Sequence, residues 1–173
     1  TALDASRLGA VVVTHASVVS LLSRSDGRVN GVVVEDRETG ERKEVQAGAV
    51  INATGPWTDI TLGMSKSPPK NDLLRPTKGI HVVLPHHKLP LNHAVVLVHP
   101  DDDRVMFAIP WGDCTYAGTT DTDFEGDPAN VHASTQDVTY TIEVLNKYFP
   151  NHQLSCDDVQ ATWAGLRPLV RPS

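Results

Sequence analysis

The chain has 173 residues, of which 40% are hydrophobic and 21% charged, and its formal net charge at pH 7 is −6. This length suits one domain with a core, or parts of two. Scattered Lys and Arg argue against a nucleic-acid partner, because phosphate backbones require clustered cations. No apolar run approaches the roughly 20 residues of a membrane-spanning helix. The two cysteines, Cys114 and Cys156, suit a reducing cytosol, leave a disulfide open and lack metal-ligand spacing.

The first 46 residues predict a helix end followed by strands. Gly9 is a helix-ending residue for the segment 1–9. The β-branched run 10–14 predicts a short buried strand. Turns at Asp26-Gly27 and Thr39-Gly40 separate three further strands, so an antiparallel meander is expected. Its strands are predicted over 17–23, 29–35 and 41–46.

An apolar run over 49–52 stops at Ala53-Thr54-Gly55-Pro56-Trp57. This order predicts a strand and then a strand-to-helix turn, with Pro56 at the first helical position. Backbone N–H groups at such a turn can bind an anionic or polar ligand. Many turns of this kind are scaffold only, and the sequence leaves both interpretations open.

The polar, proline-containing stretch 63–72 predicts a loop and a domain junction. In the next predicted strand, Ile80 and its alternate neighbours share one face, while Gly79 and His81 share the other. Short turns, including the solvated acidic turn 101–103, predict an antiparallel sheet. The strands after the loop are predicted over 73–85, 94–98, 104–110, 115–122 and 157–164.

The segment 134–149 predicts the one long helix. Ser134 can cap it, with Asp137 three residues later. An apolar stripe along the helix predicts packing on one face of the sheet. Its members are Val138, Ile142, Leu145 and Phe149. The expected fold class is therefore α+β, a mainly antiparallel sheet with a packed helix.

Arg167 is the first candidate for chemistry. Its neighbours Leu166, Pro168 and Leu169 indicate partial burial. A buried guanidinium without partners is strongly unfavourable, so it requires an anion or carbonyl groups. The partner is either a carboxylate of the protein, in a structural ion pair, or an oxygen of a substrate or cofactor.

His81 is the second candidate, because the adjacent Gly79 allows another group to approach closely. A structural role and a catalytic role both remain open for it. Asp121, in Gly118-Thr119-Thr120-Asp121-Thr122-Asp123, is the third candidate, in a segment that also suits an ordinary turn. The histidines form neither HxH nor HExxH pairs, so no metal site is predicted. A GxSxG hydrolase motif and a GxGxxG loop are likewise absent from the sequence.

Five motifs follow one another in order over residues 50–169. Together they resemble the FAD-dependent (aerobic) glycerol-3-phosphate dehydrogenase family, within the D-amino-acid-oxidase-like flavoproteins. Residues 1–49 fit this family more loosely. The motifs are Val50-Ile51-Asn52-Ala53-Thr54-Gly55-Pro56-Trp57, Lys78-Gly79-Ile80-His81-Val82-Val83, Phe107-Ala108-Ile109-Pro110-Trp111, Gly118-Thr119-Thr120-Asp121-Thr122 and Trp163-Ala164-Gly165-Leu166-Arg167-Pro168-Leu169.

The resemblance implies oxidation of sn-glycerol 3-phosphate to dihydroxyacetone phosphate, with FAD as cofactor. Electrons would pass to a membrane quinone, or to oxygen as in the oxidase branch of the family. It also implies FAD contacts at Ala53, Thr54 and Gly55, and backbone contacts with adenine near Val18. The protein would then be cytoplasmic and peripheral to the inner membrane, with a role in glycerol metabolism.

The resemblance places His81 and Arg167 at the reacting hydroxyl of the substrate. His81 could accept the hydroxyl proton, and Arg167 could stabilise the developing oxyanion. Which of the two is the base stays open at this point. Lys78 would be a further substrate-binding cation, with a weaker claim.

The family's GxGxxG segment and its Gly-Gly-Lys-Leu-Thr-Thr segment are absent from the sequence. We therefore expect an internal fragment, with residues 1–62 a remnant of the FAD-binding domain and 63–173 an incomplete substrate-binding domain. Alone, it should bind FAD weakly or not at all, be inactive, and self-associate through exposed apolar surface. Two alternatives remain: a related flavin oxidase of an amino acid, with Arg167 binding the carboxylate, or a non-catalytic interaction domain.

Overall fold

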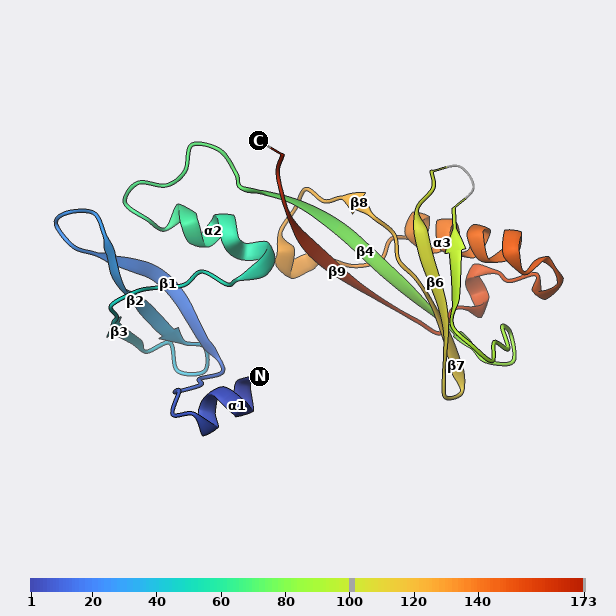
Figure 1. The fold of residues 1–173 in the computed structure, drawn as a ribbon, viewed down its shortest axis with the longest axis horizontal. Helices are drawn as coiled ribbons and strands as arrows, with labels where there is room; N and C mark the ends of the chain where they lie inside the picture. The colour runs from blue at the N-terminus through green and yellow to red at the C-terminus, as the bar shows by residue number, and fades with distance from the viewer. Residues whose placement is uncertain (100–101, 173) are drawn as a thin grey trace. The chain divides into compact units, whose positions relative to one another are not determined.

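The computed structural model describes residues 1–99 and 102–172 (Figure 1). The chain forms two compact units, Thr1–Asp72 and Leu73–Ser173. The boundary falls at the end of the polar stretch 63–72, whereas the sequence placed it at the start of that stretch.

The first unit contains a three-stranded antiparallel sheet in the order β1-β2-β3, which confirms the predicted meander. Gly27 and Gly40, in its two turns, have φ angles of 84° and 74°, values that glycine adopts without strain. The elements of this unit are α1 (Ala2–Arg7), β1 (Ala16–Ser23), β2 (Val29–Asp36), β3 (Arg42–Gln46), the 3₁₀ turn η1 (Gly55–Trp57) and α2 (Thr58–Gly63).

Two strand predictions in this unit are wrong. Residues 10–14 and 49–52 are not strands, and Val11 is 90% exposed. A β-branched run becomes a strand only when a neighbouring strand accepts its backbone hydrogen bonds. Among the described residues neither segment has such a neighbour, and the N–H of Ala10 instead bonds the carbonyl of Ala5 at the end of α1.

The second unit contains a six-stranded antiparallel sheet in the order β5-β6-β7-β4-β8, with β9 also paired to β4. The long strands β4 and β9 run side by side over their whole shared length (Figure 1). The strands are β4 (Leu74–Pro85), β5 (Val95–Val98), β6 (Val105–Trp111), β7 (Cys114–Gly118), β8 (Thr122–Asp123) and β9 (Ala161–Val170).

The last strand differs from its prediction in a way that concerns Arg167. Residues 156–158 form a 3₁₀ turn, η4 (Cys156–Asp158), held by a capping box between Ser155 and Asp158. The strand starts later and continues to Val170, because β4 offers partners as far as Leu74. Arg167 therefore lies inside a strand and not beyond its end. Two further short turns are η2 (Pro128–Asn130) and η3 (Pro150–His152).

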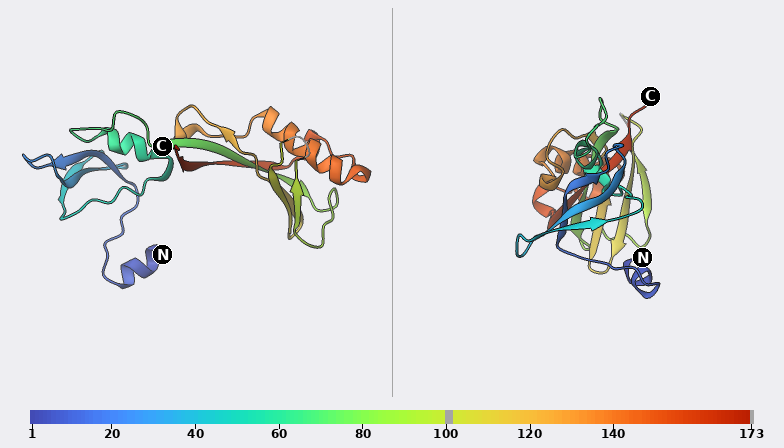
Figure 2. Two further views of the ribbon diagram at one scale, coloured as in Figure 1. Left: turned by 45° about the horizontal axis from the view of Figure 1, so that its top comes forward. Right: turned by 90° about the vertical axis from the view of Figure 1, so that its left-hand side faces the viewer.

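The helix α3 (Thr135–Tyr148) covers one face of this sheet (Figure 2). Its predicted capping box is present, with Ser134 and Asp137 bonded reciprocally. Ile142 and Leu145 of the predicted stripe are buried, and Val138 and Phe149 pack at the margin. These observations confirm the α+β class.

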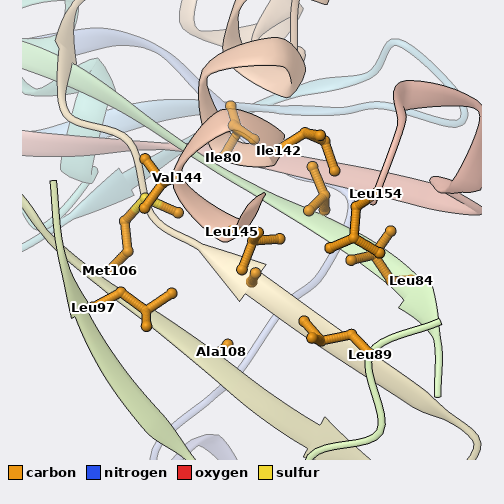
Figure 3. Packing of buried hydrophobic residues seen from close by; sticks show 12 residues of the cluster. Ile80, Leu84, Leu89, Leu97, Met106, Ala108, Ile142, Val144, Leu145 and Leu154 are labelled. Atoms are coloured by element: carbon orange, nitrogen blue, oxygen red, sulfur yellow. The ribbon is translucent and has the colours of Figure 1, made fainter. Parts of the chain in front are cut away.

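The core lies between α3 and the sheet (Figure 3). Ile80, Val82 and Leu84 of β4 point into it and are 0% exposed. In β6 the core residues are Met106 and Ala108, while Val105 and Phe107 remain exposed. The opposite face of the sheet is thus free to serve another purpose.

The acidic turn between β5 and β6 is only partly described, since Asp101 lies outside the described residues. Asp102 and Asp103 are exposed, in agreement with the predicted solvated turn. Asp102 in addition accepts hydrogen bonds from the hydroxyl of Tyr140 at 3.0 and 3.2 Å. Its carboxylate also lies 3.2 Å from Nε of Arg104. Asp102 thus ties this turn to α3.

Cys114 and Cys156 are both free thiols. Within the described part of the chain, α3 and the shorter helices are too short or too polar to cross a membrane.

Candidate active site

His81 and Arg167 lie on the same face of the β4–β9 ladder, opposite the core. The register pairs His81 with Trp163, Gly79 with Gly165, and Thr77 with Arg167. Directly opposed residues of an antiparallel pair share a face, and alternate residues along a strand share a face. The fold therefore unites two residues that are 86 positions apart in the sequence, as their numbers show.

The His81 ring lies in an aromatic setting. It stacks on the ring of Trp163, with centroids 5.0 Å apart and an interplanar angle of 21°. Tyr116 meets it edge-on at 6.0 Å. These side chains line a hollow of about 590 Å³ together with Val83, Trp111 and Cys114.

Gly118 of β7 makes room for this ring. A Cβ atom at that position would lie 2.5 Å from Cδ2 of His81 and 2.6 Å from the carbonyl oxygen of Ile80. Burial, and then the positive charge of Arg167, hold the pKa of His81 below its usual 6.5. The imidazole is therefore neutral near pH 7 and able to accept a proton.

Arg167 is held by three consecutive residues of the loop between β7 and β8. Its Nη1 donates to the carbonyl of Thr120 at 3.1 Å and to Oδ1 of Asp121 at 3.2 Å, and its Nη2 donates to Oγ1 of Thr119 at 3.0 Å. Of the two partners left open by the sequence, a protein carboxylate is thus present. These three bonds use three of the five guanidinium N–H groups, and the side chain remains 36% exposed.

The guanidinium lies across Gly79. A Cβ atom there would meet Nη2 and Nη1 of Arg167 at 2.7 and 2.9 Å, and Oγ1 of Thr119 at 2.5 Å. Any other residue would push the arginine or the loop away. A smaller hollow of about 380 Å³ opens beside this group, lined in part by Arg167, Thr119 and Asp121.

The structure does not bring Lys78 to this face. Strand alternation turns its side chain toward α3, where Nζ pairs with Oδ2 of Asp137. The two side chains are 15% and 7% exposed. Lys78 and Asp137 line a hollow of about 750 Å³ on the helix side, away from His81. The ion pair gives Lys78 a structural task, and its substrate contact stays a prediction.

The four residues expected to contact FAD belong to the first unit. Val18 lies at an irregularity in the pairing of β1 with β2. Ala53 and Thr54 are exposed and precede η1, and the hydroxyl of Thr54 donates to Oδ1 of Asn52 at 2.8 Å. Gly55 has a φ angle of 57°, and a Cβ atom there would meet nothing within 4 Å. The backbone at 53–55 is therefore accessible to a ligand.

Sequence reasoning missed the aromatic partners of His81, which are Trp163 and Tyr116, and the role of Gly118. One signal was present. Trp163, Gly165 and Arg167 alternate along one strand, so a strand continuing through Arg167 would have placed all three on one face. The pairing of His81 with both Trp163 and Gly118 depends on strand order, which local patterns do not specify.

The arrangement has a definite chemical capability. A neutral imidazole can take a proton from a substrate hydroxyl. A fixed guanidinium on the same face can stabilise the negative charge that develops on that oxygen. Such a pair suits the oxidation of an alcohol by a group that accepts a hydride.

Comparison with known proteins gives the class. The chain belongs to the family of FAD-dependent oxidoreductases, whose model matches residues 1–173. FAD is the cofactor of this family. The earlier resemblance is thereby confirmed at the level of the family.

Individual relatives narrow the class further. The chain is 43% identical over 163 residues to an alpha-glycerophosphate oxidase of Enterococcus casseliflavus, covering 94% of the chain and 27% of that protein. It is 38% identical over 162 residues to an aerobic glycerol-3-phosphate dehydrogenase of Staphylococcus haemolyticus, covering 94% and 29%. The chain thus spans less than a third of the length of these relatives.

The solved structure of glycerol-3-phosphate dehydrogenase from Bacillus halodurans, complexed with FAD, matches with a TM-score of 0.90 and 38% identity. The match covers 97% of the chain and 34% of that protein. L-proline dehydrogenase from P. horikoshii matches with a TM-score of 0.62 and 15% identity over 95% of the chain and 40% of that protein, which shows a shared fold alone.

Proposed function

We propose that the protein oxidises sn-glycerol 3-phosphate to dihydroxyacetone phosphate with FAD as its cofactor. The observation that carries this proposal is the joint placement of His81 and Arg167 on the open face of β4 and β9. The names of the relatives support the choice of substrate.

His81 is the proton acceptor in this proposal. Burial and the charge of Arg167 keep its pKa low, so the ring is neutral at physiological pH. The hydroxyl at C2 of the substrate loses its proton to the imidazole as the C2 hydride leaves, and a ketone forms. FAD, when bound, supplies the site that accepts this hydride.

Arg167 orients the same hydroxyl and stabilises the charge on its oxygen. Three hydrogen bonds and the flat surface of Gly79 fix the guanidinium before the substrate arrives. A donor held in place in this way needs little reorganisation during the reaction. The stacking of His81 on Trp163 restricts the imidazole in the same manner.

The residues of the first unit fit a contact with FAD. Ala53 and Thr54 are exposed, Gly55 is half-buried, and the open space where a Cβ atom of Gly55 would lie lets a ligand approach closely. We assign these three residues to the phosphate–ribose part of the cofactor, and backbone near Val18 to the adenine.

The electron acceptor and the location of the protein are also part of the proposal. We assign quinone as acceptor, with the protein peripheral to the membrane that holds it. Because the chain spans 34% of the FAD-containing structure, we propose that its 173 residues alone do not turn over substrate. The activity is that of the full-length protein.

The test is turnover of sn-glycerol 3-phosphate by the full-length protein with an artificial electron acceptor. Hydrogen peroxide is counted in parallel, because an oxidase releases one molecule per turnover and a quinone-dependent enzyme does not. Dye reduction without stoichiometric peroxide is expected. An amino acid as the better substrate would overturn the proposal, and stoichiometric peroxide would overturn the assignment of quinone.

A further inference from the structure

The carboxylate of Asp121 is the one charged partner among the three groups that hold Arg167. Its Oδ1 lies 3.2 Å from Nη1 of the arginine, and the two side chains are 52% and 36% exposed. Thr119 and Thr120 contribute a hydroxyl and a carbonyl, both neutral. Asp121 therefore has the dominant influence on how much positive charge Arg167 presents to the open face.

The loop that carries Asp121 is firmly attached to the strand of His81. Thr120 is 1% exposed, and its hydroxyl accepts from the N–H of Ile80 at 3.1 Å and donates to the carbonyl of Lys78 at 3.3 Å. These two residues flank Gly79, over which the guanidinium lies. The carboxylate of Asp121 is thus held in a fixed place relative to Arg167 and His81.

Arg167 is the charged group that lowers the pKa of His81. The groups that face its ring are Tyr116 from β7, Trp163 and Arg167 from β9, and the thiol of Cys114 across the hollow. Of these, Arg167 is the permanent charge. The next acid along the chain, Asp123 of β8, is bound by Nε and Nη2 of Arg75 at 2.8 and 3.0 Å.

We propose that Asp121 is a positioning residue that holds Arg167 over Gly79 and attenuates its charge at His81, and so sets the lower pH limit of the reaction. The kinetic part of this inference, the pH limit of the reaction, rests on the proposed function. In this scheme Asp121 does not touch the substrate. It acts through Arg167 alone.

The sign follows from electrostatics. Removing the negative charge of Asp121 leaves Arg167 less compensated, and the pKa of His81 falls further. Activity depends on neutral His81, so the acid limb of kcat/KM moves to lower pH. Because the lost charge acts through Arg167 and is partly screened by solvent, the acid limb of kcat/KM should shift by about half a pH unit.

The experiment compares pH profiles of kcat/KM in the full-length protein for wild type, Asp121→Asn, Asp121→Ala and Asp123→Asn. Asparagine keeps an acceptor for Arg167, so Asp121→Asn isolates the charge. Asp121→Ala also removes the acceptor, and a lower kcat should accompany the same shift. Asp123→Asn removes a comparably exposed carboxylate two residues away, 59% exposed against 52% for Asp121, and should leave the pH profile unchanged. The substrate's own phosphate titration is common to all four profiles and cancels in their differences.

NMR titration of histidine-labelled protein measures the pKa of His81 directly and without turnover. The His81→Gln variant assigns the resonance. A lower pKa of His81 in Asp121→Asn, and an unchanged one in Asp123→Asn, supports the inference even if glycerol 3-phosphate proves not to be the substrate. An unchanged or raised pKa of His81 in Asp121→Asn overturns it, whatever the substrate.

Discussion

The two faces of strand β4 share one backbone but carry side chains of different character and in different surroundings. One face carries Ile80, Val82 and Leu84 against α3, and its one cation, Lys78, is neutralised by Asp137. The other face carries Gly79 and His81 beside Arg167 and Trp163. Because side chains alternate with a period of two, adjacent residues can serve stability and the proposed chemistry separately. Substitutions on one face should therefore affect folding, and substitutions on the other should affect turnover.

The largest effect is expected at Arg167. Arg167→Ala removes the group that we propose to stabilise the oxyanion and should lower kcat/KM by on the order of 10²- to 10³-fold. The free energy of unfolding should change by less than about 1 kcal/mol, because a partly exposed ion pair contributes little. Steady-state kinetics and urea denaturation of the full-length protein measure the two quantities.

The matched control for that variant is Arg75→Ala. Arg75 also pairs with a carboxylate of the same segment, Asp123, and is exposed. Its loss should leave kcat/KM within about twofold. Equal losses of activity in the two variants would contradict the separation of roles.

Leu84→Ala tests the opposite face. The side chain is 0% exposed and contacts the core under α3, so its truncation should lower the free energy of unfolding by about 3 kcal/mol. The kcat/KM of the folded fraction should stay near that of wild type. As a control, Val96→Ala on the exposed face of β5 should change stability by no more than about 0.5 kcal/mol. A stability loss at Val96 as large as that at Leu84 would refute this division of the sheet.

Two opposed glycines provide a sharper comparison. Gly79→Ala would place a Cβ atom 2.7 Å from Nη2 of Arg167. The displaced guanidinium should cost on the order of 10- to 100-fold in kcat/KM. Gly165→Ala, at the directly paired position on β9, meets no protein atom within 4 Å and leaves Arg167 in place, so its loss of kcat/KM should be much smaller. If both variants lose activity equally, the loss comes from the strand and not from Arg167.

The smallest effect concerns acid stability. Burial would raise the pKa of Asp137, but the bonds from Lys78 and Ser134 outweigh it and hold the pKa below 3.8. Such a group stabilises the fold above its unfolded pKa, and this contribution disappears as the pH falls through the folded value. The stability difference between wild type and Asp137→Asn should therefore narrow below pH about 4. Glu143→Gln, at an exposed position on α3, serves as the control. If the stability difference between wild type and Asp137→Asn stays constant with pH, the ion pair of Asp137 with Lys78 does not stabilise the fold in this way.

Local patterns in the sequence were sufficient to predict the helix, the meander and the inward face of β4. Ser134, Asp137 and the apolar stripe define α3 by contacts within a few residues, and alternation in β4 separates Ile80 from His81. Patterns failed at residues 10–14 and 49–52, where strand formation depends on a partner strand. They also gave no sign of the ion pair of Lys78, because its partner Asp137 is 59 residues away.

The candidate site was predicted only in part, because its contacts also join segments that are far apart in the sequence. Motif order pointed to His81 and Arg167, but not to the register that sets Trp163 beside His81 or Gly79 under Arg167. Those contacts come from the pairing of β4 with both β7 and β9. Only the three-dimensional structure could supply that pairing.

The most direct test of the central claim, that the open face of β4 carries out the chemistry, is the rate of flavin reduction by sn-glycerol 3-phosphate without oxygen or dye. It is measured by stopped flow in full-length wild type and His81→Gln. Reduction in the variant should be on the order of 10²- to 10⁴-fold slower, and it should lose the dependence on pH that a single base imposes. Reduction at the wild-type rate with an unchanged pH profile would contradict the account.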